Sequence, residues 1–155
     1  MKISRLLLCS ILSVFIFGSC SKDDNEPYTL KFVHIMDNDA SSVTVSAQAN
    51  IVSTYNVYLS AQQILSPVKV TYKIVAGNGL VEGVDYEMIT KGTEISFVPG
   101  IYDMPVRIRW MANPVDPSKN NTIRIDLVGV SDPAYTIGLP GKDKNQSSLT
   151  ITKIP

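Results

Sequence analysis

The sequence predicts an all-β protein: a single antiparallel sandwich of the immunoglobulin type with about seven to eight strands. Apolar and polar residues alternate at every second position in several short segments, most clearly over residues 68–74. Such alternation places one face of a strand in a core and the other in water. Glycine and proline pairs separate the segments, and no long stretch after residue 27 has helical periodicity. Short strands at this spacing are typical of sandwiches.

The expected strands follow one another with turn signals between them. In chain order they cover residues 28–35, 43–49, 54–59, 68–74, 95–97, 106–110, 123–127 and 149–151. The segment 106–110 alternates apolar residues with Arg107 and Arg109, so Trp110 shares the inward parity and is expected in the core. Tyr72 and Tyr86 are expected at core or corner positions by the same argument.

The first 26 residues have the layout of a secretory signal that ends at a cysteine. Lys2 and Arg5 precede an apolar run over residues 6–17, and Gly18-Ser19-Cys20 follows. The run is shorter than the roughly 20 residues that a membrane-spanning helix needs. The segment resembles the lipobox of bacterial lipoproteins, where the cysteine thiol is joined to a diacylglycerol and the chain is cut just before it. The resemblance implies a signal peptide over 1–19 and lipidation of Cys20.

A polar tether over residues 20–27 is expected to connect this cysteine to a folded domain over 28–155. Within it, Lys22, Asp23 and Asp24 resemble the surface-export signal of lipoproteins in glycan-scavenging Gram-negative anaerobes. The resemblance implies a chain held in outer-membrane lipid by the acylated cysteine and displayed at the cell surface. A solvated tether on a lipoprotein that faces inward is the alternative.

The composition after the signal argues against several classes of partner and chemistry. Removing residues 1–19 from 155 leaves 136, enough for one core. Two of the 14 basic residues leave with the signal, so 12 face 14 acidic ones, and no nucleic-acid partner is expected. Cys9 is also removed and Cys20 is acylated, so no disulfide or free thiol is expected in the domain.

Several segments resemble the core pattern of Calx-beta domains, which are immunoglobulin-like sandwiches of exchangers, integrins and bacterial surface proteins. The resemblance covers about residues 43–154 and is carried by Gly83-Val84-Asp85-Tyr86, by 95–100, by the strands 106–108 and 123–127, and by Gly138 before the strand 149–151. It implies the fold and leaves the function open. For Asp85, a carboxylate that accepts backbone N–H bonds in a turn is expected.

Calcium-binding members of that family carry clustered acids between the strands that match 106–110 and 123–127, and after the last strand. Here residues 111–121 hold one acid, Asp116, and one lysine, and no acid follows residue 151. Calcium needs several oxygen ligands, mostly anionic, so neither a metal nor a cofactor is expected. Asp37-Asn38-Asp39 is expected to be a solvated turn, with a weak calcium site in an adhesin-like domain as the alternative.

The remaining functional candidates are aromatic residues in loops. His34 is the single histidine and lies in an expected strand, so no catalytic residues are predicted. Tyr102 and Tyr135 lie in expected loops, where binding residues concentrate. A solvent-facing ring at Tyr102 or Tyr135 is predicted to contact a polysaccharide or a neighbouring surface protein. The alternative is a structural or adhesin-like module that pairs with other surface proteins through an uncharged edge strand, expected over Tyr28–Ile35.

Overall fold

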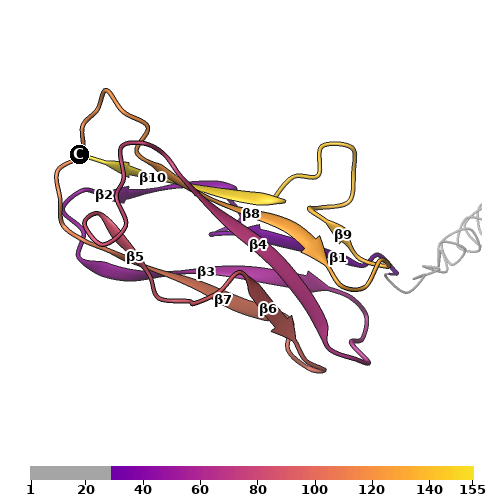
Figure 1. Ribbon diagram of the computed structural model, residues 1–155. Helices are drawn as coiled ribbons and strands as arrows, with labels where there is room; N and C mark the ends of the chain where they lie inside the picture. Colours follow the sequence, from indigo (N-terminus) through magenta and orange to yellow (C-terminus); the bar gives the residue numbers. More distant parts are fainter. Residues whose placement is uncertain (1–28) are drawn as a thin grey trace, which may run out of the picture.

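The computed structural model describes residues 29–155, which form two five-stranded sheets packed face to face (Figure 1). One sheet has the order β5-β7-β3-β1-β9 and the other β2-β10-β8-β4-β6. The strands are β1 (Phe32–Met36), β2 (Ser42–Ser46), β3 (Ile51–Ser60), β4 (Val68–Ala76), β5 (Tyr86–Met88), β6 (Glu94–Phe97), β7 (Asp103–Trp110), β8 (Thr122–Val130), β9 (Thr136–Ile137) and β10 (Ser148–Ile154).

This architecture confirms the predicted immunoglobulin-like sandwich. The eight expected strands are all present, although the first begins four residues later than predicted. The short strands β5 and β9 were not predicted, because two or three residues are too few to show alternation. The described residues contain no helix long and apolar enough to cross a membrane. The predictions for the signal, Cys20 and Lys22-Asp23-Asp24 lie outside the described residues.

The chain passes from one sheet to the other at Asp37-Asn38-Asp39-Ala40. Asn38 and Asp39 have positive φ values of 48° and 64°, which these residue types tolerate better than most. Asp37 and Ala40 exchange backbone hydrogen bonds of 3.0 Å in both directions. The predicted turn is therefore present. It lets β1 pair with β3 and lets β2, a few residues later, pair with β10 in the opposite sheet.

Two strand pairs depart from the predicted antiparallel arrangement. β2 runs parallel to β10, and β9 runs parallel to β1. β2 pairs parallel with β10, whereas the isolated bridge between Asp37 and Ala40 in the turn before it is antiparallel. β10 thus lies between β2 and β8, with a parallel neighbour on one side and an antiparallel neighbour on the other.

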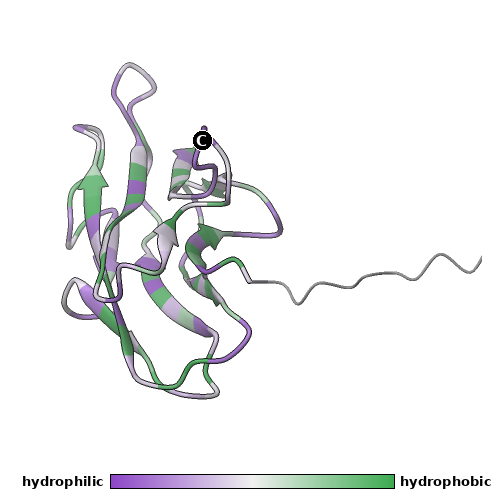
Figure 2. Cartoon of the chain, turned by 90° about the vertical axis from the view of Figure 1, so that its right-hand side faces the viewer, coloured by the Kyte–Doolittle hydropathy of each residue, from purple (hydrophilic) through white to green (hydrophobic). Residues whose placement is uncertain are grey.

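The core lies between the sheets. Its buried residues confirm the predicted alternation of apolar and polar positions along the strands. Hydrophilic and hydrophobic bands follow one another along the strands in Figure 2. Trp110 and Tyr72 are fully buried, as predicted. The Trp110 indole N–H donates a hydrogen bond of 3.2 Å to the Tyr55 hydroxyl, so the polar atom of the largest core side chain has a partner.

The prediction of a free edge strand over Tyr28–Ile35 is wrong. β1 has β3 on one side, while the segment that contains β9 covers its other side. Thr136 N–H donates to the Lys31 carbonyl at 3.0 Å, Gly138 N–H to the Val33 carbonyl at 2.8 Å, and Ile35 N–H to the Gln146 carbonyl at 2.8 Å. Along the described part of the chain, the sheet edges are instead β2, β5, β6 and β9.

Candidate functional site

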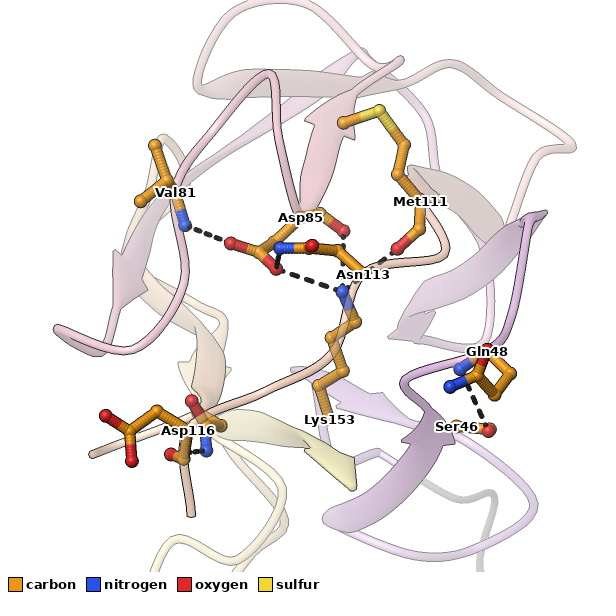
Figure 3. Close-up of polar contacts among 9 residues, drawn as sticks. Ser46, Gln48, Val81, Asp85, Met111, Asn113, Asp116 and Lys153 are labelled. Carbon is orange, nitrogen blue, oxygen red and sulfur yellow. Dashed lines mark hydrogen bonds and ion pairs between the residues drawn. The ribbon is translucent and has the colours of Figure 1, made fainter. Parts of the chain in front are cut away.

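One end of the sandwich is closed by a buried ion pair between Asp85 and Lys153 (Figure 3). Asp85 lies just before β5 and is 3% exposed, while Lys153 lies on β10 and is 1% exposed. The Lys153 Nζ is 3.1 Å from Asp85 Oδ1. Lys153 has the inward parity of Leu149 and Ile151, so the strand itself carries the ammonium into the core end.

Hydrogen bonds satisfy both charges, as Figure 3 shows. The ammonium also donates to the Met111 carbonyl at 2.9 Å and, at 3.4 Å, to the Asp85 carbonyl. The Asp85 carboxylate accepts from Val81 N–H and from the Asn113 amide, both at 2.9 Å. The predicted role of Asp85 as a backbone N–H acceptor is therefore confirmed. The network joins the β4–β5 loop, the β7–β8 linker and β10.

The electrostatics of Asp85 follow from these contacts. Burial alone raises the pKa of its carboxyl, but the hydrogen bonds from Asn113, Val81 and Lys153 and the charge of Lys153 outweigh burial. The net effect holds the pKa of Asp85 below its ordinary value. The carboxylate is thus ionised and fully engaged, so this end of the molecule is a structural clamp built around a cation of the chain itself.

The β7–β8 linker packs beside this clamp and brings no acid to it. Asp116 is exposed, and its Oδ1 accepts from Ser118 N–H at 2.9 Å and from the Ser118 hydroxyl at 2.6 Å. These bonds lower the pKa of Asp116 and form a local turn. Within residues 29–155, no three His, Cys, Asp or Glu side chains are grouped closely enough to hold a metal ion.

The two predicted tyrosines, Tyr102 and Tyr135, pack on the same hydrophobic core, away from the clamp. Tyr102 precedes β7, whereas Met111 of the clamp follows it. Burial raises the pKa of Tyr135, and Asp132 adds a smaller contribution in the same direction. The prediction of a solvent-facing ring is wrong for Tyr135, which is 5% exposed in the core. Tyr102 is half-buried against the same core.

Tyr135 nevertheless lines a small cleft of about 180 Å³. Its other polar walls are Lys31, Gln63, Ser66 and Asp132. The Lys31 ammonium lies 5.5 Å from the centroid of the Tyr135 ring, within reach of a cation–π contact. The cleft therefore combines one aromatic ring with amide, carboxylate, hydroxyl and ammonium groups. Loops far apart in the sequence form this cleft, so no local sequence motif predicts it.

A second cleft, of about 380 Å³, lies next to the first. It is mainly apolar, with Leu30, Ile137, Leu139 and Pro140 in its walls and the lysines Lys31 and Lys144 beside them. Lys31 lines both clefts. Thr29, the first residue that the structure describes, lines this second cleft.

His34 takes part in packing on the outer face of β1. Its ring lies 5.2 Å from that of Phe32 and 5.3 Å from that of Tyr58, measured between centroids. Burial lowers its pKa, so the imidazole is neutral at pH 7. It lies outside both clefts.

The architecture is that of a Calx-beta-like β-sandwich, and one solved structure with it is the crystal structure of CBD12 from CALX1.2. The match has a TM-score of 0.57 and 17% sequence identity, and it covers 79% of this chain and 43% of that one. This chain therefore spans less than half of the matched chain. No protein-family model and no curated protein matches the sequence.

Proposed function

We propose that this chain is a non-catalytic, lipid-anchored β-sandwich of the outer-membrane surface that binds a glycan or a protein segment as an accessory of nutrient capture. The observation that carries the proposal is the cleft formed by Tyr135, Lys31, Gln63 and Asp132. Its amide and carboxylate groups can match sugar hydroxyls, and the buried Tyr135 forms part of the wall. The buried charges of the clamp are engaged with each other and support structure rather than chemistry.

The predicted anchor constrains which ligands can reach this cleft. Thr29 lies nine positions after Cys20 in the sequence, and nine steps of fully extended chain span about 30 Å. Lipidation of Cys20 would therefore hold the cleft within about 30 Å of the membrane surface. A short glycan or an exposed loop of a neighbouring surface protein fits this position.

Isothermal titration against a panel of oligosaccharides tests the binding site. We expect Gln63→Ala to weaken binding about fivefold, because one neutral hydrogen bond contributes roughly 1 kcal/mol. Gln62→Ala is the matched control, since Gln62 is an exposed neighbour that does not line the cleft. Tyr135→Phe removes only a hydroxyl and keeps the packing. Absence of heat from every glycan and from candidate surface proteins would refute the binding role.

Membrane fractionation tests the anchor separately. Cys20→Ser is expected to prevent lipidation and to move the chain from the membrane to the soluble fraction. Replacing Lys22, Asp23 and Asp24 by alanine is expected to keep the chain in the membrane and to protect it from protease added to intact cells. A Cys20→Ser chain that stays membrane-bound would contradict the anchor.

A second candidate function, assembly with other surface proteins through an edge strand, is supported by a different strand from the one predicted. β2 lies at an edge of its sheet and has β10 as its single neighbour.

A further inference from the structure

Among the four edge strands in the described part of the chain, β2 alone lacks the usual protection of an edge. β5 and β6 carry Glu87 and Glu94, and β9 has two residues. β2 has five residues without a charge or a proline, and it belongs to a run over 40–68 that holds no Asp, Glu, Lys, Arg or His. Long, uncharged edges with high β propensity readily accept another strand.

The backbone of β2 also presents free hydrogen-bonding groups. Thr150 N–H donates to the Ser41 carbonyl, and Ala47 N–H donates to the Ile154 carbonyl. The odd-numbered residues of β2 therefore bond to β10, and the even-numbered ones point away from it. Within residues 29–155, the N–H and C=O groups of Ser42 and Thr44 have no backbone partner. The Ser46 carbonyl accepts one bond, from Ala49 N–H at 3.0 Å, and retains a second lone pair.

The strand sequence is the same in both directions: Ser42-Val43-Thr44-Val45-Ser46. We propose that β2 pairs antiparallel with β2 of a second copy of this chain, about a two-fold axis at Thr44. Thr44 then faces Thr44 of the second copy, and Ser42 faces Ser46. These are the residues with outward backbone groups, so each opposed pair exchanges both N–H···O bonds. A two-fold interface must be complementary to itself, and a palindromic strand meets that condition.

The side chains suit this register. Ser42, Thr44 and Ser46 are exposed on the outer face, where Ser–Ser and Thr–Thr contacts replace the like-charge contacts that would oppose pairing. Val43, half-buried in the single copy, would be covered by Val45 of the other. This pairing gives the proposed assembly function a specific partner, a second copy of the chain. It depends on neither the anchor nor the tyrosine cleft, so it can fail or hold independently of them.

Cysteine cross-linking tests the register. The core lies within residues 33–151, so the chain from residue 20 onward keeps it, and Cys20→Ser leaves that chain without a thiol. In this background we expect Thr44→Cys to form a covalent dimer on mild oxidation. The two Cα atoms on the axis would be about 5.5 Å apart, within the range of a disulfide. Non-reducing electrophoresis and mass spectrometry would show a doubled mass.

Ser42→Cys is the matched control on the same strand. Two copies of Ser42 would be four residues apart along the strand, about 13 Å, too far for a disulfide. We expect no dimer from Ser42→Cys alone and a dimer from a mixture of Ser42→Cys with Ser46→Cys. Equal cross-linking by Thr44→Cys and Ser42→Cys, or none by either, would overturn the proposal.

Charge pairing on the axis provides a second test. Thr44→Lys and Thr44→Asp each place two like charges opposite each other, so sedimentation should find each variant monomeric at concentrations where the parent chain dimerises. An equimolar mixture should restore the dimer. Circular dichroism would verify folding, since the side chain of Thr44 is exposed. A parent chain that stays monomeric at millimolar concentration, or a Thr44→Lys variant that still dimerises, would refute the pairing.

Discussion

Lys153 occupies a strand position where its neighbours of the same parity are Leu149 and Ile151. A charge at such a position is costly unless a partner and further hydrogen bonds replace water. Asp85 and the Met111 carbonyl meet that requirement. The pair therefore fixes which segments meet at this end of the core, because neither charge is tolerated there without the other.

Replacing Lys153 should test whether the buried Asp85 carboxylate depends on the lysine ammonium. We expect Lys153→Met to lower the free energy of unfolding by about 3–5 kcal/mol, since it leaves the Asp85 carboxylate buried without its cation. Urea denaturation measures the loss. Lys69→Met is the control, because the exposed pair of Lys69 with Glu94, 2.9 Å apart, is worth less than about 1 kcal/mol. The double variant Asp85→Asn/Lys153→Met should recover part of the stability. Equal effects of the two lysine substitutions would argue against the clamp.

His34 should make stability depend on pH in the mildly acidic range. Its folded-state pKa lies below the ordinary 6.5 because of burial, so the unfolded chain takes up the proton first as pH falls. The contribution of the neutral His34 to the free energy of unfolding is complete above about pH 6.5 and decreases below that value. Thermal unfolding at pH 7.5 and 5.5 should show a larger fall in Tm for the parent chain than for His34→Phe. A parallel fall in both chains would show that other groups dominate this window.

At the scale of the element, β10 takes part both in a sheet and in the clamp. It pairs with β2 and β8, and it carries Lys153 to the clamp. β2 depends on this one ladder, in which residues alternate between bonding to β10 and facing away from it. The two kinds of position should differ sharply in their tolerance of proline, which lacks the N–H group.

We expect Val43→Pro to destabilise the sandwich by about 1–3 kcal/mol, because the Val43 N–H faces β10 and its carbonyl partner would be left unpaired. Thr44→Pro should cost much less, since the Thr44 N–H points outward. Thermal unfolding of the two neighbouring variants makes the comparison. If Thr44→Pro were the more harmful, the deduced alternation along β2 would be incorrect.

At the scale of the whole molecule, the sandwich has two dissimilar ends. One is held by the clamp, and the other has two clefts near the start of the described chain. Calcium should have no effect on either end. We expect Tm to change by less than about 1 °C in millimolar calcium, because Lys153 already neutralises Asp85 and Asp116 serves a local turn. A rise of several degrees would indicate a site that binds the folded state.

The sequence predicted the parts of this molecule that depend on local periodicity. Eight strands and the buried Trp110 follow from alternation, and the same parity rule extended by one step from Ile151 would have found Lys153 in the core. The switch to a parallel β2 and the covering of β1 by β9 depend on which strands meet across the fold. The Tyr135 cleft depends on loops more than 60 residues apart, and such convergence leaves no trace in a local pattern.

The interior position of β10 has a consequence for the order in which the domain can be completed during synthesis. Among the strands within residues 29–155, β10 is the last to be made, yet it lies between β2, one of the first, and β8. Until it emerges, β2 has no neighbour in its sheet and the carboxylate of Asp85 has no counter-ion. The second sheet therefore cannot be assembled strand by strand in the order of synthesis. Its completion awaits a long-range pairing, which makes folding slow relative to local structure formation.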